Sequence, residues 1–262
     1  MSVNSYLTQV SSKLVLSDNE KSSINTSINT LQTRLDFYFG QSVIKHFQFG
    51  SSTRGTVLPG KVDSRSDIDY MIVFNSSDDE GSPYTYLDQL RRFVNSEYSA
   101  QEIRQSSPRI RLCLNEINFE LVPAIGFSGE YKIPSPKSTW TAWMNTDPAK
   151  TKKAFQEKNK SNHNNIKPLI RLAKYWNAVN NHPYTSFSLE RHIIGRYFLF
   201  CTSLKDYFYS FWDDISYNFS TASHIIDMID SVKKNITRAR EYERDNMHAS
   251  AEKVIKKIIP VL

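Results

Sequence analysis

Residues 49–74 read FGSSTRGTVLPGKVDSRSDIDYMIVF, and this stretch decides the fold and the chemistry that we expect. Its end, Asp67–Phe74, is β-branched and apolar after an acidic start, which predicts a buried strand. Since residues i and i+2 of a strand point to the same face, Asp67 and Asp69 hold two carboxylates side by side. Such carboxylates repel each other unless a divalent cation binds them, and hard oxygen ligands suit magnesium. The pair therefore predicts a metal site.

Just upstream, Gly50 and Ser51 open a polar segment that reads as turns as far as residue 66. Glycine leaves the backbone open to close approach, and serine adds a hydroxyl group, so this turn suits a phosphate tail. Asp-x-Asp pairs at strand ends are also common as caps or exposed groups. The prediction of a metal site therefore depends on the other motifs.

A third carboxylate, Glu120, comes late in a second strand-like run at residues 108–122. If that run neighbours the first strand, three carboxylates converge and can bind two ions, one for an attacking hydroxyl and one for a leaving pyrophosphate. The alternative is an exposed strand residue. The apolar neighbours Phe119 and Leu121 argue against that alternative.

The later part of the chain adds two candidate phosphate contacts. Lys167, Arg171 and Lys174 follow an i, i+4, i+7 spacing, which places them on one helix face. Ser186 and Phe187 begin another helix, where an N-terminus attracts phosphate and a ring can stack on a base. The alternatives are a solvated basic face for the first group and a core aromatic for the phenylalanine.

The order of elements indicates an α+β protein with two lobes. Residues 1–40 read as mostly helical, strands and helices follow, residues 126–148 read as an ordered connection, and helices make up the rest. We predict a catalytic lobe of residues 1–148, including the N-terminal helix, and a helical lobe of residues 149–262. We expect the active site in the cleft between them.

Composition narrows the class of partner. The chain of 262 residues has a net charge of +6, which permits nucleic acids, nucleotides and other acidic ligands. Its densest basic cluster reads either as a nucleic-acid contact or as a solvated helix face: Lys150, Lys152, Lys153, Lys158 and Lys160. Two distant cysteines argue against a zinc ribbon and favour a reducing cytoplasm. We find neither a secretory signal nor an apolar run of the roughly 18 residues that a membrane helix needs, so we expect a cytoplasmic protein without membrane contact.

Four motifs, taken together, resemble one superfamily. Residues 49–74 resemble the Gly-Ser…Asp-x-Asp signature of polymerase-β-like nucleotidyltransferases. EINFELVPAI (116–125) resembles the third-carboxylate strand of oligoadenylate synthetases, archaeal CCA-adding enzymes and cGAS-like enzymes, and IKPLIRLAKYWN (166–177) resembles their spine helix. YKIPSPKSTWTAWMNTDP (131–148) is similar to a connection in bacterial cGAS/DncV-like nucleotidyltransferases, or CD-NTases. The resemblance covers most of residues 40–200.

The resemblance implies a role for each matching residue. Asp67 and Asp69 match the metal-binding pair, and Glu120 matches a third carboxylate that is more often aspartate in the family. The longer glutamate side chain puts the coordination geometry and the activity in doubt. The implied cofactor is a pair of magnesium ions, with manganese as a second candidate. The residues that match nucleotide-binding positions are Gly50, Ser51, Arg171, Lys174, Ser186 and Phe187, the last standing where the family has tyrosine.

A polymerase-β-like core with a helical C-terminal lobe is therefore expected to join nucleoside triphosphates. The CD-NTase resemblance implies a cyclic di- or trinucleotide second messenger in anti-phage signalling of the CBASS type, bound by a separate downstream effector. An RNA or DNA activator fits the positive charge. Three alternatives stay open: linear oligonucleotide synthesis or RNA tailing, nucleotide transfer onto a protein or small molecule, and a degenerate nucleotide or RNA sensor.

Overall fold

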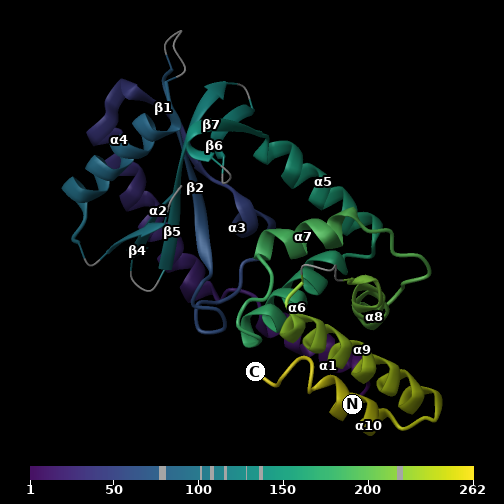
Figure 1. Ribbon diagram of the computed structural model, residues 1–262. Coiled ribbons are helices and arrows are strands. Elements are labelled where there is room, and N and C mark those ends of the chain that lie inside the picture. Colours follow the sequence, from purple (N-terminus) through teal and green to yellow (C-terminus); the bar gives the residue numbers. More distant parts are fainter. Residues whose placement is uncertain are drawn as a thin grey trace. The chain divides into compact units, whose positions relative to one another are not determined.

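The computed structural model describes residues 1–76, 81–100, 102–106, 109–114, 117–127, 129–135, 138–216 and 221–262. Contacts between Cα atoms divide the chain into two compact units (Figure 1). The sheet unit comprises Leu16–Ala154. The helical unit comprises Met1–Val15 together with Phe155–Leu262.

The sheet unit is built on seven strands that the structure describes, in the order β1-β2-β5-β4-β3, with β6 pairing β5 and β7 pairing β6. Only β2 and β5 are paired in parallel among these strands; the other pairs are antiparallel. Its elements are α2 (Asp18–Phe39), η1 (Gly40–Ser42), β1 (Val43–Gln48), α3 (Gly50–Arg54), β2 (Asp67–Phe74), α4 (Pro83–Glu97), β3 (Ile103–Ser106), β4 (Arg109–Leu114), β5 (Ile117–Phe127), β6 (Glu130–Ser135), β7 (Ser138–Thr146) and the start of α5 (Pro148–Ser161).

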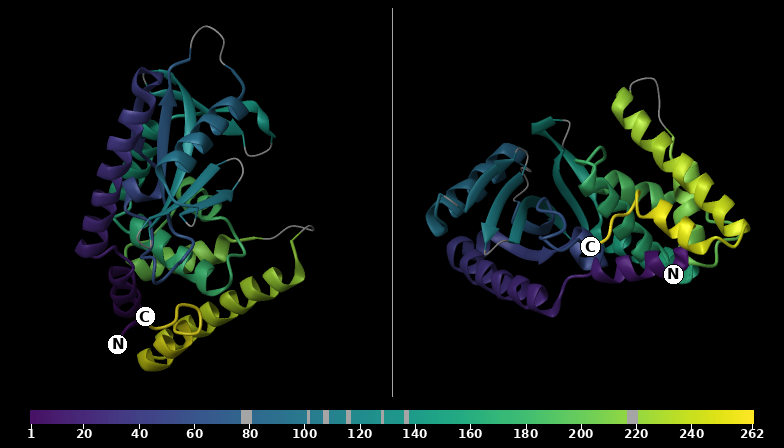
Figure 2. Two further views of the ribbon diagram at one scale, coloured as in Figure 1. Left: turned by 90° about the vertical axis from the view of Figure 1, so that its left-hand side faces the viewer. Right: turned by 90° about the horizontal axis from the view of Figure 1, so that it is seen from below.

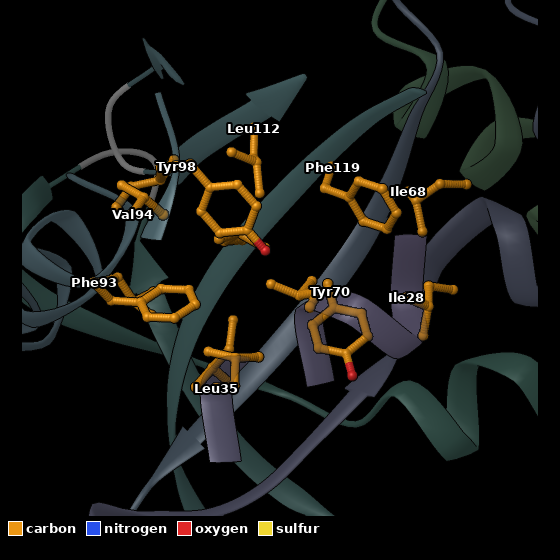
Figure 3. Close-up of a cluster of buried hydrophobic side chains, with 14 of the residues drawn as sticks. Ile28, Leu35, Ile68, Tyr70, Phe93, Val94, Tyr98, Leu112 and Phe119 are labelled. Carbon is orange, nitrogen blue, oxygen red and sulfur yellow. The ribbon is translucent and has the colours of Figure 1, made fainter. Parts of the chain in front are cut away.

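One face of this sheet is a continuous apolar core. Alternate residues of β2 point into it, and α2 and α4 cover it with the apolar stripe that each helix presents. Figure 3 shows Tyr70 of β2, Leu35 of α2 and Phe93 of α4 gathered there, and each of these side chains is fully buried. Since the core needs only this face, the side chains on the opposite face of β2 are available for a functional site.

The opposite face changes from apolar to acidic along β2. Met71 and Val73 pack with Val122 and Ala124 of β5 in a smaller core cluster. Asp67 and Asp69 share that face because they continue the same period of two. The alternation of one strand therefore anchors the sheet on one side and offers carboxylates on the other.

Several predicted elements are confirmed, and two segments differ. The predicted strand Asp67–Phe74 is β2, with the same bounds, and Gly40 ends α2 at a positive φ of 49°. The segment 51–66, predicted as turns, begins inside the short helix α3. The predicted connection at 126–148 contains β6 and β7. Proline is tolerated in β6 because Pro134 lies beyond the residues that pair β5 and next to a shift in the register with β7.

The helical unit consists of α1 (Val3–Lys13), the rest of α5, α6 (Ile166–Val179), α7 (Ser186–Gly195), α8 (Leu204–Asp214), α9 (Ser223–Arg244) and α10 (His248–Ile255). Helix α10 packs beside the long helix α9 (Figure 2). None of the helices within the described ranges is both long and apolar enough to cross a membrane.

The compact units divide the chain differently from the predicted domains. Helix α1 packs on α6, α8 and α10, so it belongs with the helical unit, whereas we predicted it in the catalytic lobe. The division near the middle of the chain falls within α5, a few residues after the predicted boundary at 148. The reason for the first difference is that α1 buries Tyr6, Leu7 and Val10, an apolar stripe whose partner could not be read from local spacing.

The Tyr6 hydroxyl joins the two ends of the chain by donating to the carbonyl of Ile259 at 2.6 Å. We expect Tyr6→Phe to leave this buried carbonyl without its donor and to cost about 1 kcal/mol of stability. The check is a fall in melting temperature of about 2–4 °C. Tyr197→Phe is the control, because Tyr197 is 84% exposed. Equal melting temperatures for the two variants would contradict the prediction.

Candidate active site

Three carboxylates converge because of the strand register. Parallel pairing of β2 with β5 sets Asp67 opposite Asn118 and Asp69 opposite Glu120. Residues paired in this way share a face of the sheet, and one carboxylate oxygen of each acid lies within 4.8 Å of the others. The predicted convergence of Asp67, Asp69 and Glu120, named here the acidic triad, is therefore present in the structure.

Gly50 lies directly against this triad. It has a φ of +72°, and a Cβ atom there would lie 1.8 Å from Oδ2 of Asp69, closer than any side chain tolerates. The amide of Phe49 donates to the carbonyl of Asp69 at 3.0 Å, which holds the start of α3 on β2. Glycine is needed at residue 50 for both reasons, the left-handed backbone and the close approach. Ser51 follows it within α3.

The pKa of the Asp69 carboxyl is raised to about 7. Burial contributes most, and the negative charges of Asp67 and Glu120 add to it. Arg109 and Arg54 act in the opposite direction. Near neutral pH the Asp69 carboxyl therefore exchanges a proton readily, and a cation that binds the triad competes with that proton.

Two arginines of β4 contact the triad, and our sequence analysis did not identify them. Arg109 Nη1 donates to Glu120 Oε2 at 2.5 Å, and Arg111 Nη2 donates to Asp67 Oδ2 at 3.4 Å. The signal was present in Arg109–Leu114 (RIRLCL), where arginines alternate with apolar residues. Alternation places both arginines on one face, but only the pairing of β4 with β5 shows which face.

The donor set fits a divalent cation. All three groups are carboxylates, the hard oxygen ligands that magnesium and manganese take in proteins. Their oxygens are close enough to share an ion, and their mutual repulsion, seen in the raised pKa of Asp69, would be relieved by one.

The predicted residues of the spine helix are buried in the helical unit. Lys174 Nζ pairs with Glu190 Oε1 of α7 at 2.7 Å, and the two side chains are 6% and 3% exposed. Arg171 Nε donates to the carbonyl of Ser11 at 3.2 Å, which connects α6 to α1. The alternative of a solvated basic face does not hold for these two residues. Their contacts with a nucleotide stay a prediction.

Ser186 and Phe187 form the first turn of α7, as the sequence predicted. Thr185 caps this turn, since its hydroxyl accepts from the amide of Ser188 at 3.1 Å. Phe187 is 62% exposed, with the guanidinium of Arg191 at 5.7 Å from its ring centre, so it is no core aromatic. Gly50 and Ser51 lie with the triad in the sheet unit, whereas Arg171, Lys174, Ser186 and Phe187 lie in the helical unit.

The five lysines predicted as a cluster lie on α5, where Phe155 is the buried residue. Four of them are exposed to solvent: Lys150, Lys152, Lys153 and Lys160. Lys158 is half-buried beside the rings of Tyr197 and Phe198. Burial lowers its pKa. Exposed lysines suit a nucleic-acid contact as well as a solvated helix face, so both interpretations stay predictions for these four, while Lys158 takes part in packing.

The sequence shows the family. The sequence profile of the Second Messenger Oligonucleotide or Dinucleotide Synthetase domain, SMODS, matches residues 1–159. The chain belongs to the SMODS family. This membership confirms the predicted resemblance to bacterial CD-NTases and, at the level of the family, the expectation of an enzyme.

One curated relative and several solved structures resemble this SMODS chain. A probable cyclic nucleotide synthase of Bacillus cereus (strain VD146) is 27% identical over 198 residues, which are 60% of this chain and 56% of the relative. The chain thus spans just over half the length of that relative. CdnC of E. coli MS115-1, solved with ATP, superposes with a TM-score of 0.74 at 14% identity, covering 100% of this chain and 98% of CdnC. The apo form of Vibrio cholerae DncV gives 0.76 at 11% identity, covering 99% and 95%. These likenesses confirm the predicted fold.

We expect Gly50→Ala to displace the Asp69 carboxylate and to weaken Mn²⁺ binding about tenfold or more, as losses next to metal ligands do. Titration of the purified protein with Mn²⁺ measures the change. Gly195→Ala is the control, because a Cβ atom at residue 195 meets nothing within 4 Å. Unchanged affinity in Gly50→Ala would contradict the close approach.

We expect Asp69→Asn to stabilise the metal-free protein at pH 8. The folded pKa is about 7 and the unfolded pKa about 3.9, so ionised Asp69 costs stability above pH 7, and this cost disappears as the pH falls from 7 to 4. Melting curves in a chelating buffer should show a gain of at least about 2 °C at pH 8 that shrinks toward pH 4. Asp227→Asn, at an exposed residue of α9, is the control. A loss of stability at pH 8 would refute the repulsion.

Proposed function

We propose that this protein is a magnesium-dependent nucleotidyltransferase that joins nucleoside triphosphates into a cyclic di- or trinucleotide. The observation that carries the proposal is the acidic triad, with its oxygens within 4.8 Å of one another on a SMODS fold. Gly50 lets the backbone at the start of α3 lie directly against the Asp69 carboxylate. Manganese is a second candidate for the ion.

In this proposal, Asp67, Asp69 and Glu120 hold up to two divalent ions. When bound, the ions would lower the pKa of the attacking sugar hydroxyl and stabilise the leaving pyrophosphate. The residues of the chain position the substrate: the turn at Gly50 and Ser51 receives phosphate oxygens. The nucleophilic oxygen attacks the α-phosphorus, the bond from that phosphorus to the bridging oxygen breaks, and pyrophosphate leaves.

The helical unit supplies the remaining contacts in the proposal. Lys174, oriented by Glu190, and Ser186 hold the β- and γ-phosphates, with Arg171 one helical turn before Lys174. Exposed Phe187 stacks on a base, since a phenyl ring retains the stacking of tyrosine and loses only its hydroxyl.

The relatives support the substrates and the product. The B. cereus relative is described as a probable cyclic nucleotide synthase, and the matched structures include CdnC with ATP and a CD-NTase with GTP. A cyclic product would act as a cytoplasmic second messenger of the CBASS type on a separate effector. Activation by RNA or DNA stays part of the proposal, and the matched complex of CdnC with HORMA-deltaN supports a protein partner as well.

The test is a product assay with α-labelled nucleoside triphosphates and Mg²⁺ or Mn²⁺, followed by phosphatase. We expect a phosphatase-resistant product from the wild type, because a cyclic nucleotide has no terminal phosphate. Asp67→Asn/Asp69→Asn should abolish it. A product with removable terminal phosphates would instead support linear synthesis, and labelling of an added protein or small molecule would support transfer. If no nucleotide is incorporated under any condition, with or without added RNA, the proposal is refuted.

Glu120 provides a second test of the same site. Loss of the third carboxylate in Glu120→Ala should reduce product formation by at least about a hundredfold, since it removes a metal ligand. Glu120→Asp keeps the charge and should retain measurable synthesis. Equal activity of wild type and Glu120→Ala, with Asp67→Asn inactive, would remove Glu120 from the site. Circular dichroism of each variant checks that the fold is intact.

A further inference from the structure

Arg109 and Arg111 are the least expected members of the site. A metal site gains nothing in affinity from nearby cations, since like charges repel. Yet both guanidinium groups lie on the face of the sheet that carries the triad, because antiparallel pairing sets Arg111 opposite Glu120 and alternation puts Arg109 on the same side. Their presence calls for a physical reason.

Arginines offset part of the negative charge of the triad without a metal ion. Three carboxylates face three arginines, since Arg54 also acts on Asp69. Arg109 is the closest of them, with Nη1 at 2.5 Å from Glu120 Oε2, a carboxylate that is 10% exposed. In a partly buried site such a pair offsets much of the repulsion among the acids.

The second pair is looser and incompletely bonded. Arg111 Nη2 lies 3.4 Å from Asp67 Oδ2, at the long end of a hydrogen bond. The Nε atom of Arg111 is buried and has no hydrogen-bond partner among the described residues. An arginine held at one end, with a donor unsatisfied, can be displaced from its carboxylate at low cost.

We propose that Arg109 and Arg111 are positioning residues that hold Glu120 and Asp67 in the metal-free enzyme and release them when a divalent ion binds. This inference rests on the proposed metal-dependent function. The bond that Arg109 makes engages Oε2, one of the two carboxylate oxygens of Glu120, so arginine and ion compete for the same carboxylate. Once released, the guanidinium groups face the phosphates of an incoming nucleotide, whose negative charge compensates theirs.

The test compares Arg109→Gln with the wild type by its melting temperature and its Mn²⁺ affinity. A purely structural role for Arg109 would not lower the first and raise the second. We expect a lower melting temperature in a chelating buffer, because the carboxylates lose their counter-ion. We also expect Mn²⁺ affinity, measured by electron paramagnetic resonance, to tighten at least about threefold, because the competing cation is gone. Arg109→Lys should stay close to the wild type in both.

Arg92→Gln is the matched control. It removes another arginine–carboxylate pair from the sheet unit, the 2.8 Å contact with Asp88 within α4, and should leave Mn²⁺ affinity unchanged. If Arg109→Gln does not fold, Arg111→Gln carries the test, with the same directions and a smaller effect because its contact is longer.

The outcomes separate this inference from the proposed function. Unchanged or weaker Mn²⁺ affinity in the folded arginine variants overturns the proposal that arginine and ion compete for the carboxylates. The proposed function stays intact in that case if the wild type binds Mn²⁺ and Asp67→Asn/Asp69→Asn does not. A wild type that binds no Mn²⁺ overturns both.

Discussion

The repulsion among three carboxylates on one face of a sheet is the constraint on which the rest of the site depends. Strand pairing fixes the backbone of Asp67, Asp69 and Glu120 side by side, so their charges must be compensated at this place. The raised pKa of Asp69 is one consequence, in which the repulsion adds to the larger effect of burial. The two arginines of β4 are another. In the proposed function, binding of a cation is the third, and it relieves the repulsion while supplying the chemistry.

Burial on the opposite face of the sheet offsets the free-energy cost of this repulsion. Large side chains from β2, β4 and β5 pack there against α2 and α4, and that burial, rather than any contact at the site, supplies the free energy that holds the strands in register. The position of Gly50 also depends on packing elsewhere in the sheet unit. A backbone that approaches a carboxylate so closely gains no packing energy from a side chain, so its position is maintained by the strands on either side.

In the helical unit, a charged residue is compensated by burial in a single ion pair. Lys174 and Glu190 are almost completely buried as a pair, and a buried pair stabilises only while both partners are present. Such a pair fixes the orientation of a lysine more firmly than solvent would. In the proposed function this orientation places the ammonium group for phosphate, which is why we treat Glu190 as part of the nucleotide-binding arrangement although sequence reasoning did not single it out.

The sequence by itself determined the elements with strong local periods and the residue types of the chemistry. The strand Asp67–Phe74 and the two acids on one of its faces follow from alternation, because this signal lies within a few residues of the chain. Only the tertiary structure decided that Glu120 stands beside Asp69, that the arginines of β4 reach the triad, and that α1 belongs with the helical unit. Strand pairing and helix packing join residues that are far apart in the chain. An alternating or amphipathic pattern predicts which face of an element is buried, but it does not predict which other element covers that face.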